Sequence, residues 1–199
     1  TLAFKDFAAR FMARTMSHFL ENKNIEITIL VATSGDTGSA VANGFFNIEG
    51  INVIILYPSN CVSALQEKQL TTLGENIIAL EIDGSFDDCQ RMVKAAFQDD
   101  DLQNRYSLSS ANSINVARLL PQSVYYAWAW NQSHETGPII FSVPSGNFGN
   151  ITGGLLANRM GIPMEKIIAS TNSNDVFPNY LKTGNVEKRD AIHTISNAM

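Results

Sequence analysis

Cysteine is scarce in this sequence, which has only Cys61 and Cys89 among its 199 residues. The two belong to no Cys-x-x-Cys motif and to no Cys/His spacing that binds zinc, so no metal site is predicted. Long apolar runs are also missing: stretches such as Ile51 to Tyr57 are too short to cross a bilayer, and no charged-apolar-small leader opens the chain. We therefore predict a soluble protein of a reducing compartment, the cytoplasm.

Clusters of positive charge are missing as well. The 14 basic and 19 acidic residues are interspersed and give a net charge of −5, so neither nucleic acid nor an anionic membrane is an expected partner. Any anionic ligand must therefore be held by a local site. The hydrophobic content of 45% is enough to bury a core, in one domain or in two small lobes.

What the sequence does contain is a repeated order of short apolar run, glycine- or proline-containing turn and amphipathic segment, which is typical of parallel βα units. Ser85 and Asp88 add a capping-box arrangement at the start of one helix. Most strands are rich in Val, Ile and Leu, as expected when helices cover both faces of a sheet. The predicted fold is α/β, with doubly wound, mostly parallel sheets and helices on both faces. Strands are predicted at 27–32, 52–57, 76–82, 105–108, 139–143 and 167–170, and helices at 7–20, 37–46, 63–73, 86–98, 114–130 and 151–160.

The polar stretch at residues 131–138, Asn-Gln-Ser-His-Glu-Thr-Gly-Pro, is the expected boundary between two lobes. We predict a segment at residues 1–19 packed between the lobes, a smaller α/β lobe at 20–130, and part of a larger lobe at 131–199. The second lobe is expected to be incomplete. The chain begins at Thr1 without an initiator Met, and we expect it to be a fragment.

Lys5 stands at the head of the first predicted helix, near the apolar residues Phe4, Phe7, Phe11 and Met12. Burial among such side chains lowers the pKa of a lysine and frees its amine to form an imine with an aldehyde. The alternative is a solvated lysine in the first turn of a helix, where most lysines occur. This segment alone leaves both interpretations open.

The loop Ser145-Gly146-Asn147-Phe148-Gly149-Asn150 joins a predicted strand to a predicted helix. Its glycines allow backbone N–H groups to turn inward, and a helix N-terminus adds partial positive charge, so the loop suits a phosphate. The alternative is a simple turn, and the loop lacks the Gly-x-Gly-x-x-Gly pattern of dinucleotide sites. A reactive lysine and a phosphate loop together are the two halves of a pyridoxal 5'-phosphate site, and we predict that cofactor.

A second loop, Thr33-Ser34-Gly35-Asp36-Thr37-Gly38-Ser39, also lies between a predicted strand and a predicted helix. Hydroxyls and N–H donors at a helix start suit a small carboxylate or a phosphate. The alternative is an ordinary helix cap, with Ser34, Asp36 or Thr37 supplying the capping oxygen. Two such loops on one sheet favour a ligand site, because these folds bind ligands at the carboxyl ends of strands.

A third candidate is the segment from Asn112 to Arg118. If Asn112 opens a helix, Asn115 and Arg118 follow at successive i+3 steps on one face. An arginine in that position can bind a phosphate through two parallel hydrogen bonds. The alternative is a capped helix with a surface arginine.

Taken together, these segments resemble the threonine synthase family, in the same order and over essentially the whole chain. Agreement of so many segments makes accidental similarity improbable. The matching segments are Thr1-Leu2-Ala3-Phe4-Lys5-Asp6-Phe7, Thr33-Ser34-Gly35-Asp36-Thr37-Gly38, Leu65-Gln66-Glu67-Lys68, Ser110-Ala111-Asn112-Ser113-Ile114-Asn115, Val143-Pro144-Ser145-Gly146-Asn147-Phe148-Gly149, Thr171-Asn172-Ser173-Asn174-Asp175 and Ser196-Asn197-Ala198-Met199.

The resemblance implies a pyridoxal phosphate enzyme with the tryptophan synthase β type of fold. It implies that Lys5 is the Schiff-base lysine and the catalytic residue. It also implies that the cofactor phosphate is bound by Gly146, Asn147, Phe148, Gly149 and Asn150. It implies that the substrate carboxylate is bound by Ser34, Gly35, Asp36, Thr37 and Gly38, and the substrate phosphate by Asn115 and Arg118.

The implied reaction converts O-phospho-L-homoserine and water into L-threonine and phosphate through a pyridoxal phosphate aldimine, with Lys5 also acting as the base. This is a phosphate-eliminating carbon-oxygen lyase reaction and the last step of threonine biosynthesis. In the family, the partner of the pyridine nitrogen comes from a C-terminal segment outside this chain, so this piece alone need not be active.

Other functions remain open at this point. A threonine dehydratase or a cysteine synthase has the same fold but needs no site for a substrate phosphate. In the loop that corresponds to Thr33–Ser39, those enzymes usually have Ser-Gly-Asn. This chain has Ser34-Gly35-Asp36 there, which favours threonine synthase. A non-catalytic homologue that binds phosphate esters is a further alternative, and Lys5 makes it less attractive. A nucleotide-binding domain is disfavoured because dinucleotide and Walker motifs are missing.

Overall fold

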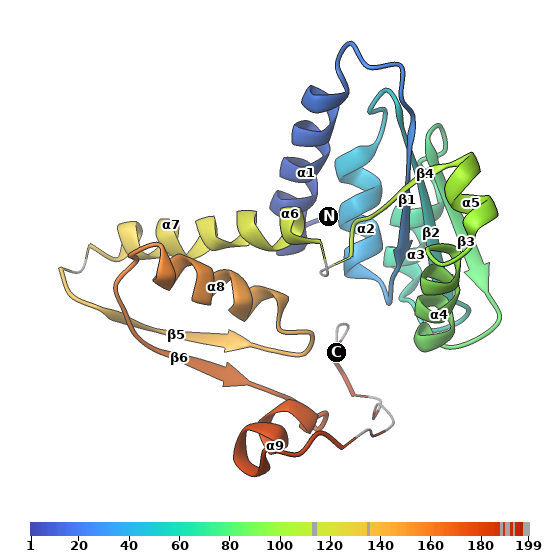
Figure 1. The fold of residues 1–199 in the computed structure, drawn as a ribbon. Helices are drawn as coiled ribbons and strands as arrows, with labels where there is room; N and C mark the ends of the chain where they lie inside the picture. The colour runs from blue at the N-terminus through green and yellow to red at the C-terminus, as the bar shows by residue number, and fades with distance from the viewer. Residues whose placement is uncertain (113–114, 135, 188, 190–191, 193, 197–199) are drawn as a thin grey trace. The chain divides into compact units, whose positions relative to one another are not determined.

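The computed structural model describes residues 1–112, 115–134, 136–187, 189, 192 and 194–196. The chain forms two compact units, Thr1–Pro121 and Gln122–Met199, each of which is described by itself (Figure 1). The division expected from the sequence, at residues 1–19, 20–130 and 131–199, stays a prediction. Within the described ranges, no helix is long and apolar enough to cross a membrane.

The first unit is built on a parallel sheet with the strand order β3-β2-β1-β4. The predicted α/β class with parallel strands is therefore confirmed. The strands are β1 (Ile27–Ala32), β2 (Ile51–Pro58), β3 (Ile77–Ile82) and β4 (Ser107–Ser110). The helices are α1 (Lys5–Leu20), α2 (Asp36–Phe45), α3 (Ala64–Thr71), α4 (Phe86–Ala96), α5 (Asp100–Arg105) and α6 (Val116–Leu119).

Helices cover both faces of this sheet, as predicted. Alternate residues of a strand point to opposite faces, so Ile29 and Val31 of β1 join a core with α1, α2 and α3. Leu30 and Ala32 of the same strand pack instead with Cys89 of α4. Figure 1 shows α1 and α2 on one side of the sheet and α4 on the other. Burial on both faces explains why β1 is an unbroken apolar run after its first two residues.

Small residues allow α1 to pack closely on α2. Ala8, Ala9 and Ala13 of α1 are completely buried. A Cβ atom on Gly44 of α2 would lie only 3.0 Å from the carbonyl carbon of Ala9, so a larger residue there would push the two helices apart. This contact fixes α1, which carries Lys5, relative to α2, which carries Asp36.

One expectation about helices in this part of the chain is wrong, and one helix was not predicted. The single helix predicted at 114–130 is divided into α6, a 3-10 helix at Leu120–Gln122 and α7 (Ser123–Ser133). Pro121 lies in the break, where its missing N–H group cannot continue the helical hydrogen-bond pattern. The short helix α5 was not predicted; Asp99 caps it by accepting a hydrogen bond from Leu102 N. Ile114, the predicted helix start, lies outside the described residues.

The second unit contains a parallel pair of strands, β5 (Ile139–Pro144) and β6 (Met164–Ser170), with the helices α7, α8 (Gly149–Arg159) and α9 (Val176–Thr183). One face of the pair is covered by α7 and α8, through a core that includes Tyr126, Val143 and Ala157. On the strands, Ile140 and Ile168 remain 52% and 45% exposed. The predicted strand at 167–170 begins three residues earlier, and α9 was not predicted.

Two glycines allow α8 to lie directly on α7 and the turn before it. A Cβ atom on Gly153 would come within 2.9 Å of Gln122 Cβ, and one on Gly154 within 2.7 Å of the Tyr126 ring. The Tyr126 ring has little room to move away, because its hydroxyl oxygen lies 2.8 Å from Asn150 Oδ1. Both positions therefore require a residue without a side chain.

Replacing Gly154 with alanine is expected to destabilise the full-length protein by up to about 2 kcal/mol. Overpacking against Tyr126 costs about 1–3 kcal/mol, which outweighs the gain of about 1 kcal/mol in helix propensity. Gly137→Ala is the matched control, because a Cβ atom there meets nothing within 4 Å. Urea unfolding measures both variants, and equal stability of the two would contradict the packing described here.

Candidate active site

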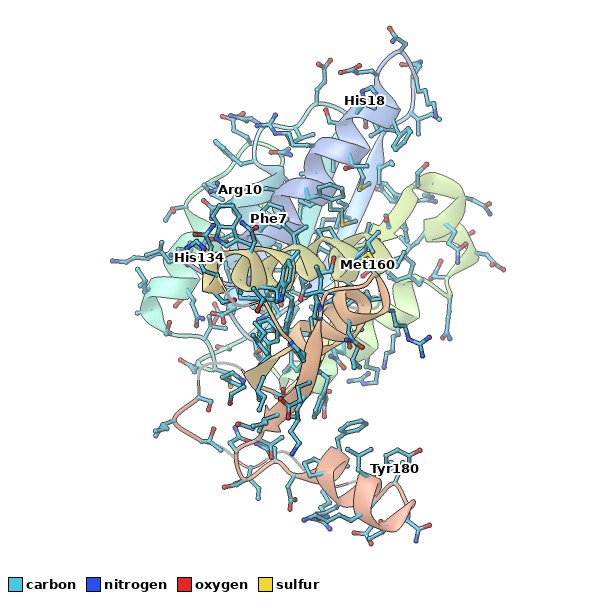
Figure 2. The ribbon with its side chains drawn as sticks, turned by 90° about the vertical axis from the view of Figure 1, so that its left-hand side faces the viewer. Phe7, Arg10, His18, His134, Met160 and Tyr180 are labelled. Atoms are coloured by element: carbon cyan, nitrogen blue, oxygen red, sulfur yellow. The ribbon has the colours of Figure 1, made fainter. Side chains whose placement is uncertain are left out.

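Lys5 is the first residue of α1 and lies mostly out of solvent. Its side chain is 17% exposed, and its Nζ is 3.8 Å from Asp36 Oδ2. Phe7 and Phe11, two of the aromatic residues expected to shield Lys5, are themselves 41% and 47% exposed, so their shielding is incomplete. Figure 2 shows Phe7 on α1. Met12 is buried, as expected. The alternative of a solvated lysine is therefore wrong.

The pKa of Lys5 is lowered from its ordinary value. Burial is the largest cause, because it disfavours the charged ammonium; the Asp36 carboxylate raises the pKa, and the Arg118 guanidinium lowers it. The net effect is a larger fraction of neutral amine at a given pH than an exposed lysine has. The predicted desolvation of Lys5 is confirmed, and its chemical role stays a prediction.

The loop after β1 is organised by Thr33. Its Oγ1 accepts hydrogen bonds from the backbone N–H groups of Gly35, at 3.0 Å, and Gly38, at 2.8 Å. Gly35 is the N-cap residue of α2, with φ of 141°, and no side chain at that position caps the helix. The alternative, an ordinary helix cap by Ser34, Asp36 or Thr37, is therefore wrong. Asp36, the first residue of α2, is thereby held beside Lys5.

Gln66 of α3 is a neighbour of this loop to which sequence reasoning assigned no role. It is buried, and its Nε2 donates a hydrogen bond to Asp36 Oδ1 at 2.5 Å. The available signal was its place in the segment Leu65-Gln66-Glu67-Lys68, one of those that resemble threonine synthases. A polar residue on a helix usually indicates a solvated face, and here that general rule does not hold.

Asn112 does not open a helix. Its amide pairs with the end of β1, where Nδ2 donates to Ala32 O at 2.8 Å and Oδ1 accepts from Ala32 N at 3.3 Å. The helix begins instead after Asn115, whose Oδ1 accepts a hydrogen bond from Ala117 N at 3.0 Å. The expectation for Asn112 is therefore wrong, while Asn115 lies at the helix start. Ser113, between them, is outside the described residues.

Arg118 is one of the most deeply buried side chains of the first unit, with 1% exposure. Its Nη1 donates a hydrogen bond to Ala111 O at 2.5 Å. Burial lowers the pKa of Arg118 to about 10, so the guanidinium stays charged at neutral pH. The surface-arginine alternative is wrong. Arg118 is thus a buried cation whose charge acts on Lys5.

The loop after β5 lies in the second unit and leads directly into α8. Ser145 anchors its start, with its N–H donating to Ser170 O at 2.7 Å. Phe148 is the N-cap residue in a left-handed conformation, with φ of 57°, and offers no side-chain cap. Gly149 N donates to Asn147 Oδ1 at 3.3 Å. The loop thus leads into the N-terminus of a helix, and the binding of a phosphate there stays a prediction.

Asn150, the last residue of this loop, is held by Tyr126. The Tyr126 hydroxyl oxygen lies 2.8 Å from Asn150 Oδ1 and 3.1 Å from its carbonyl oxygen. Burial raises the pKa of Tyr126 to about 12, so the hydroxyl keeps its proton and remains a donor. The Phe148 ring packs on Phe177, with centroids 4.4 Å apart. The loop is therefore fixed by contacts within its own unit.

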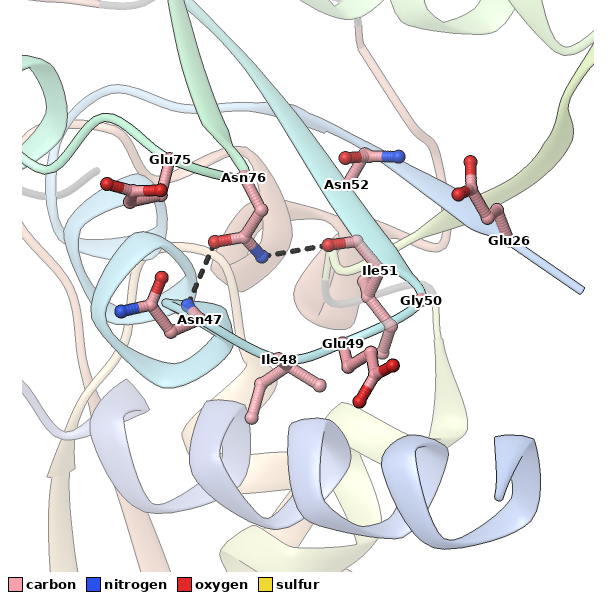
Figure 3. Close-up of a pocket in the computed structure, with 9 residues that line it drawn as sticks. All are labelled: Glu26, Asn47, Ile48, Glu49, Gly50, Ile51, Asn52, Glu75 and Asn76. Carbon is pink, nitrogen blue, oxygen red and sulfur yellow. Dashed lines mark hydrogen bonds between the residues drawn. The ribbon is translucent and has the colours of Figure 1, made fainter. Parts of the chain in front are cut away.

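A separate pocket of about 290 Å³ lies at the amino ends of β1, β2 and β3, as Figure 3 shows. Asn76 organises it by donating to the carbonyl oxygens of Phe45 and Ile51 and accepting from Asn47 N. None of the predicted site residues lines this pocket. Sheets of this class bind ligands at the carboxyl ends of their strands, where the Thr33 loop lies, so the pocket is not part of the candidate site.

Comparison with known proteins identifies relatives of this chain. A sequence model of the family described as "Pyridoxal-phosphate dependent enzyme" matches residues 1–199. Threonine synthase of Buchnera aphidicola subsp. Baizongia pistaciae is 55% identical over 201 residues, which cover 100% of this chain and 47% of that protein. The crystal structure of threonine synthase from Escherichia coli has a TM-score of 0.92 and 49% identity, with coverage of 100% of this chain and 46% of that chain. The structure of PLP-bound threonine synthase from Brucella melitensis has a TM-score of 0.86 and 42% identity, with coverage of 97% and 42%.

The chain spans about half the length of the curated relatives that it matches. The matched part covers the whole of this chain, so it includes both the Lys5 segment of the first unit and the glycine loop of the second. Since the family model extends over every residue, the chain belongs to the family of pyridoxal-phosphate dependent enzymes.

Proposed function

We propose that this chain is part of a threonine synthase, which converts O-phospho-L-homoserine and water into L-threonine and phosphate. The observation that carries the proposal is the buried amine of Lys5, 3.8 Å from the Asp36 carboxylate, in a chain that is 55% and 50% identical to two threonine synthases along its whole length. The proposed location is the cytoplasm, which suits the free thiols of Cys61 and Cys89.

The residues present fit pyridoxal phosphate. Burial lowers the pKa of Lys5, so its amine is more often unprotonated and able to attack an aldehyde. Phe148, the N-cap residue of α8, supplies no side-chain cap, and the start of this helix suits a phosphate. We propose that Lys5 holds the aldehyde carbon and that the loop residues Gly146, Asn147, Phe148, Gly149 and Asn150 hold the phosphate. The bound cofactor supplies an electron sink for the bonds at the substrate Cα.

Lys5 has a second proposed role, as the base that moves protons on the substrate. Its neutral amine takes the proton from Cα, and the ammonium so formed is stabilised by the Asp36 carboxylate. Burial and the Arg118 guanidinium oppose that stabilisation, so the ammonium can give the proton back at a later carbon. A lysine with an ordinary pKa would release its proton less readily at neutral pH.

The substrate has two anionic groups, and the chain offers an arrangement for each. We propose that the loop Ser34, Gly35, Asp36, Thr37 and Gly38 takes the carboxylate at the start of α2. Thr33 Oγ1 holds the loop in shape by accepting from Gly35 N and Gly38 N, so the proposed donors are the other backbone N–H groups of the loop. Asn115 and Arg118 take the phosphate. The Arg118 guanidinium remains charged at neutral pH and stabilises the phosphate as it leaves.

Replacing Lys5 with alanine in the full-length protein is expected to abolish threonine formation, because no other amine takes its place. Assays with O-phospho-L-homoserine, serine and threonine in turn measure the products. The wild type is expected to release threonine and phosphate from O-phospho-L-homoserine alone. Lys23→Ala, a change of an exposed lysine, is the control and should leave the rate unchanged. Threonine formation by the Lys5→Ala protein at the wild-type rate would refute the proposed catalyst, and turnover of serine or threonine alone would indicate another enzyme of this fold.

Arg118→Lys is expected to raise KM for O-phospho-L-homoserine and to lower kcat/KM by about 10- to 100-fold, because an ammonium cannot reproduce the two parallel hydrogen bonds of a guanidinium. Inhibition by inorganic phosphate should weaken in parallel. Arg91→Lys, at an exposed arginine, is the matched control. Steady-state kinetics measure both, and an unchanged KM together with unchanged phosphate inhibition would assign the substrate phosphate to other residues.

A further inference from the structure

Gln66 is held at both ends of its side-chain amide. Its Nε2 donates to Asp36 Oδ1 at 2.5 Å, and its Oε1 accepts a hydrogen bond from Ser63 Oγ at 3.0 Å. Ser63 is also the N-cap residue of α3 and accepts a hydrogen bond from Gln66 N at 3.3 Å. With its oxygen used by Ser63, the amide presents its N–H group to Asp36, and the side chain is only 9% exposed.

The loop that carries Asp36 is shaped around this amide. Gly35 has φ of 141°, and a Cβ atom there would lie 2.5 Å from Gln66 Oε1 and 2.7 Å from Nε2. Any side chain at position 35 would displace the amide. Gly35 is therefore required both by its backbone conformation and by the place that Gln66 occupies.

The two oxygens of Asp36 have different neighbours. Oδ1 accepts the short hydrogen bond from Gln66, and Oδ2 lies 3.8 Å from Lys5 Nζ, beyond hydrogen-bond distance. Attraction between opposite charges grows as their separation falls. The bond to Gln66 thus limits how strongly Asp36 can hold the proton on Lys5.

We propose that Gln66 is a positioning residue that restrains Asp36 at this distance and so keeps the Lys5 amine available for the cofactor aldehyde. The inference rests on the role proposed for Lys5. Without the amide, the carboxylate can rotate toward the ammonium and form a direct hydrogen-bonded ion pair. Two charged groups among the described residues act on Lys5. Asp36 of α2 raises the pKa of Lys5, whereas Arg118 of α6 and burial lower it.

The test is the pH dependence of acetylation of Lys5 by acetic anhydride in the full-length apo-protein, measured by mass spectrometry. Only the unprotonated amine reacts. In Gln66→Met the profile is expected to move to higher pH, and the rate at neutral pH to fall about five- to tenfold, as the carboxylate closes on Lys5. Gln66→Asn, whose amide is one methylene too short, should act in the same direction. Gln69→Met, on the same helix, is the matched control and should leave the profile unchanged.

A double variant separates positioning from a purely structural role. Asp36→Asn removes the carboxylate, so the Lys5 profile should move to lower pH, and adding Gln66→Met should then change nothing further. An unshifted profile in folded Gln66→Met and Gln66→Asn proteins, or an effect of Gln66→Met that persists beside Asp36→Asn, would overturn the inference. If the wild type attaches the cofactor to Lys5 while these profiles stay unshifted, only the role of Gln66 is refuted. Failure of the wild type to attach the cofactor there would refute the proposed function itself.

Discussion

The electrostatic contact between Lys5 and Asp36 is the interaction on which the role proposed for Lys5 depends. A buried ammonium with no counter-charge would lose its proton, and one in a tight ion pair would keep it. At 3.8 Å, with the Arg118 guanidinium as an opposing charge, Lys5 is between these limits. An amine of this kind can both attack a carbonyl carbon and carry a proton.

The backbone around this contact is held by hydrogen bonds that converge on the end of β1. Thr33 caps the following helix through two N–H groups, and Asn112 pairs with Ala32 as a further strand residue would. Arg118 is tied to Ala111 in the same segment as Asn112. The close packing of Gly44 on Ala9 then fixes α1 to α2. Each charged group is therefore positioned by a different element, and all of these elements belong to one unit.

Local sequence patterns predicted much of this architecture. The bounds of β1, the capping box at Ser85 and the helices on both faces of the sheet are confirmed, because apolar periodicity and caps act over a few residues. The predicted helix at 114–130 was wrong because Pro121 interrupts the hydrogen bonding within an otherwise helical pattern. The segment α5, with six residues, is too short for periodicity to identify.

The parts of the candidate site that sequence patterns missed depend on contacts between distant residues. The amide of Asn112 bonds to a strand 80 positions earlier, and that of Gln66 to a carboxylate 30 positions earlier. Asparagine and glutamine usually indicate caps and solvated faces, and only the tertiary fold shows that these two are buried or paired.

The role of Lys5 is tested most directly by adding pyridoxal phosphate to the full-length protein, reducing with borohydride and mapping the labelled peptide by mass spectrometry. The label is expected on Lys5 alone; a label on another lysine, or none, would contradict the role assigned to this residue.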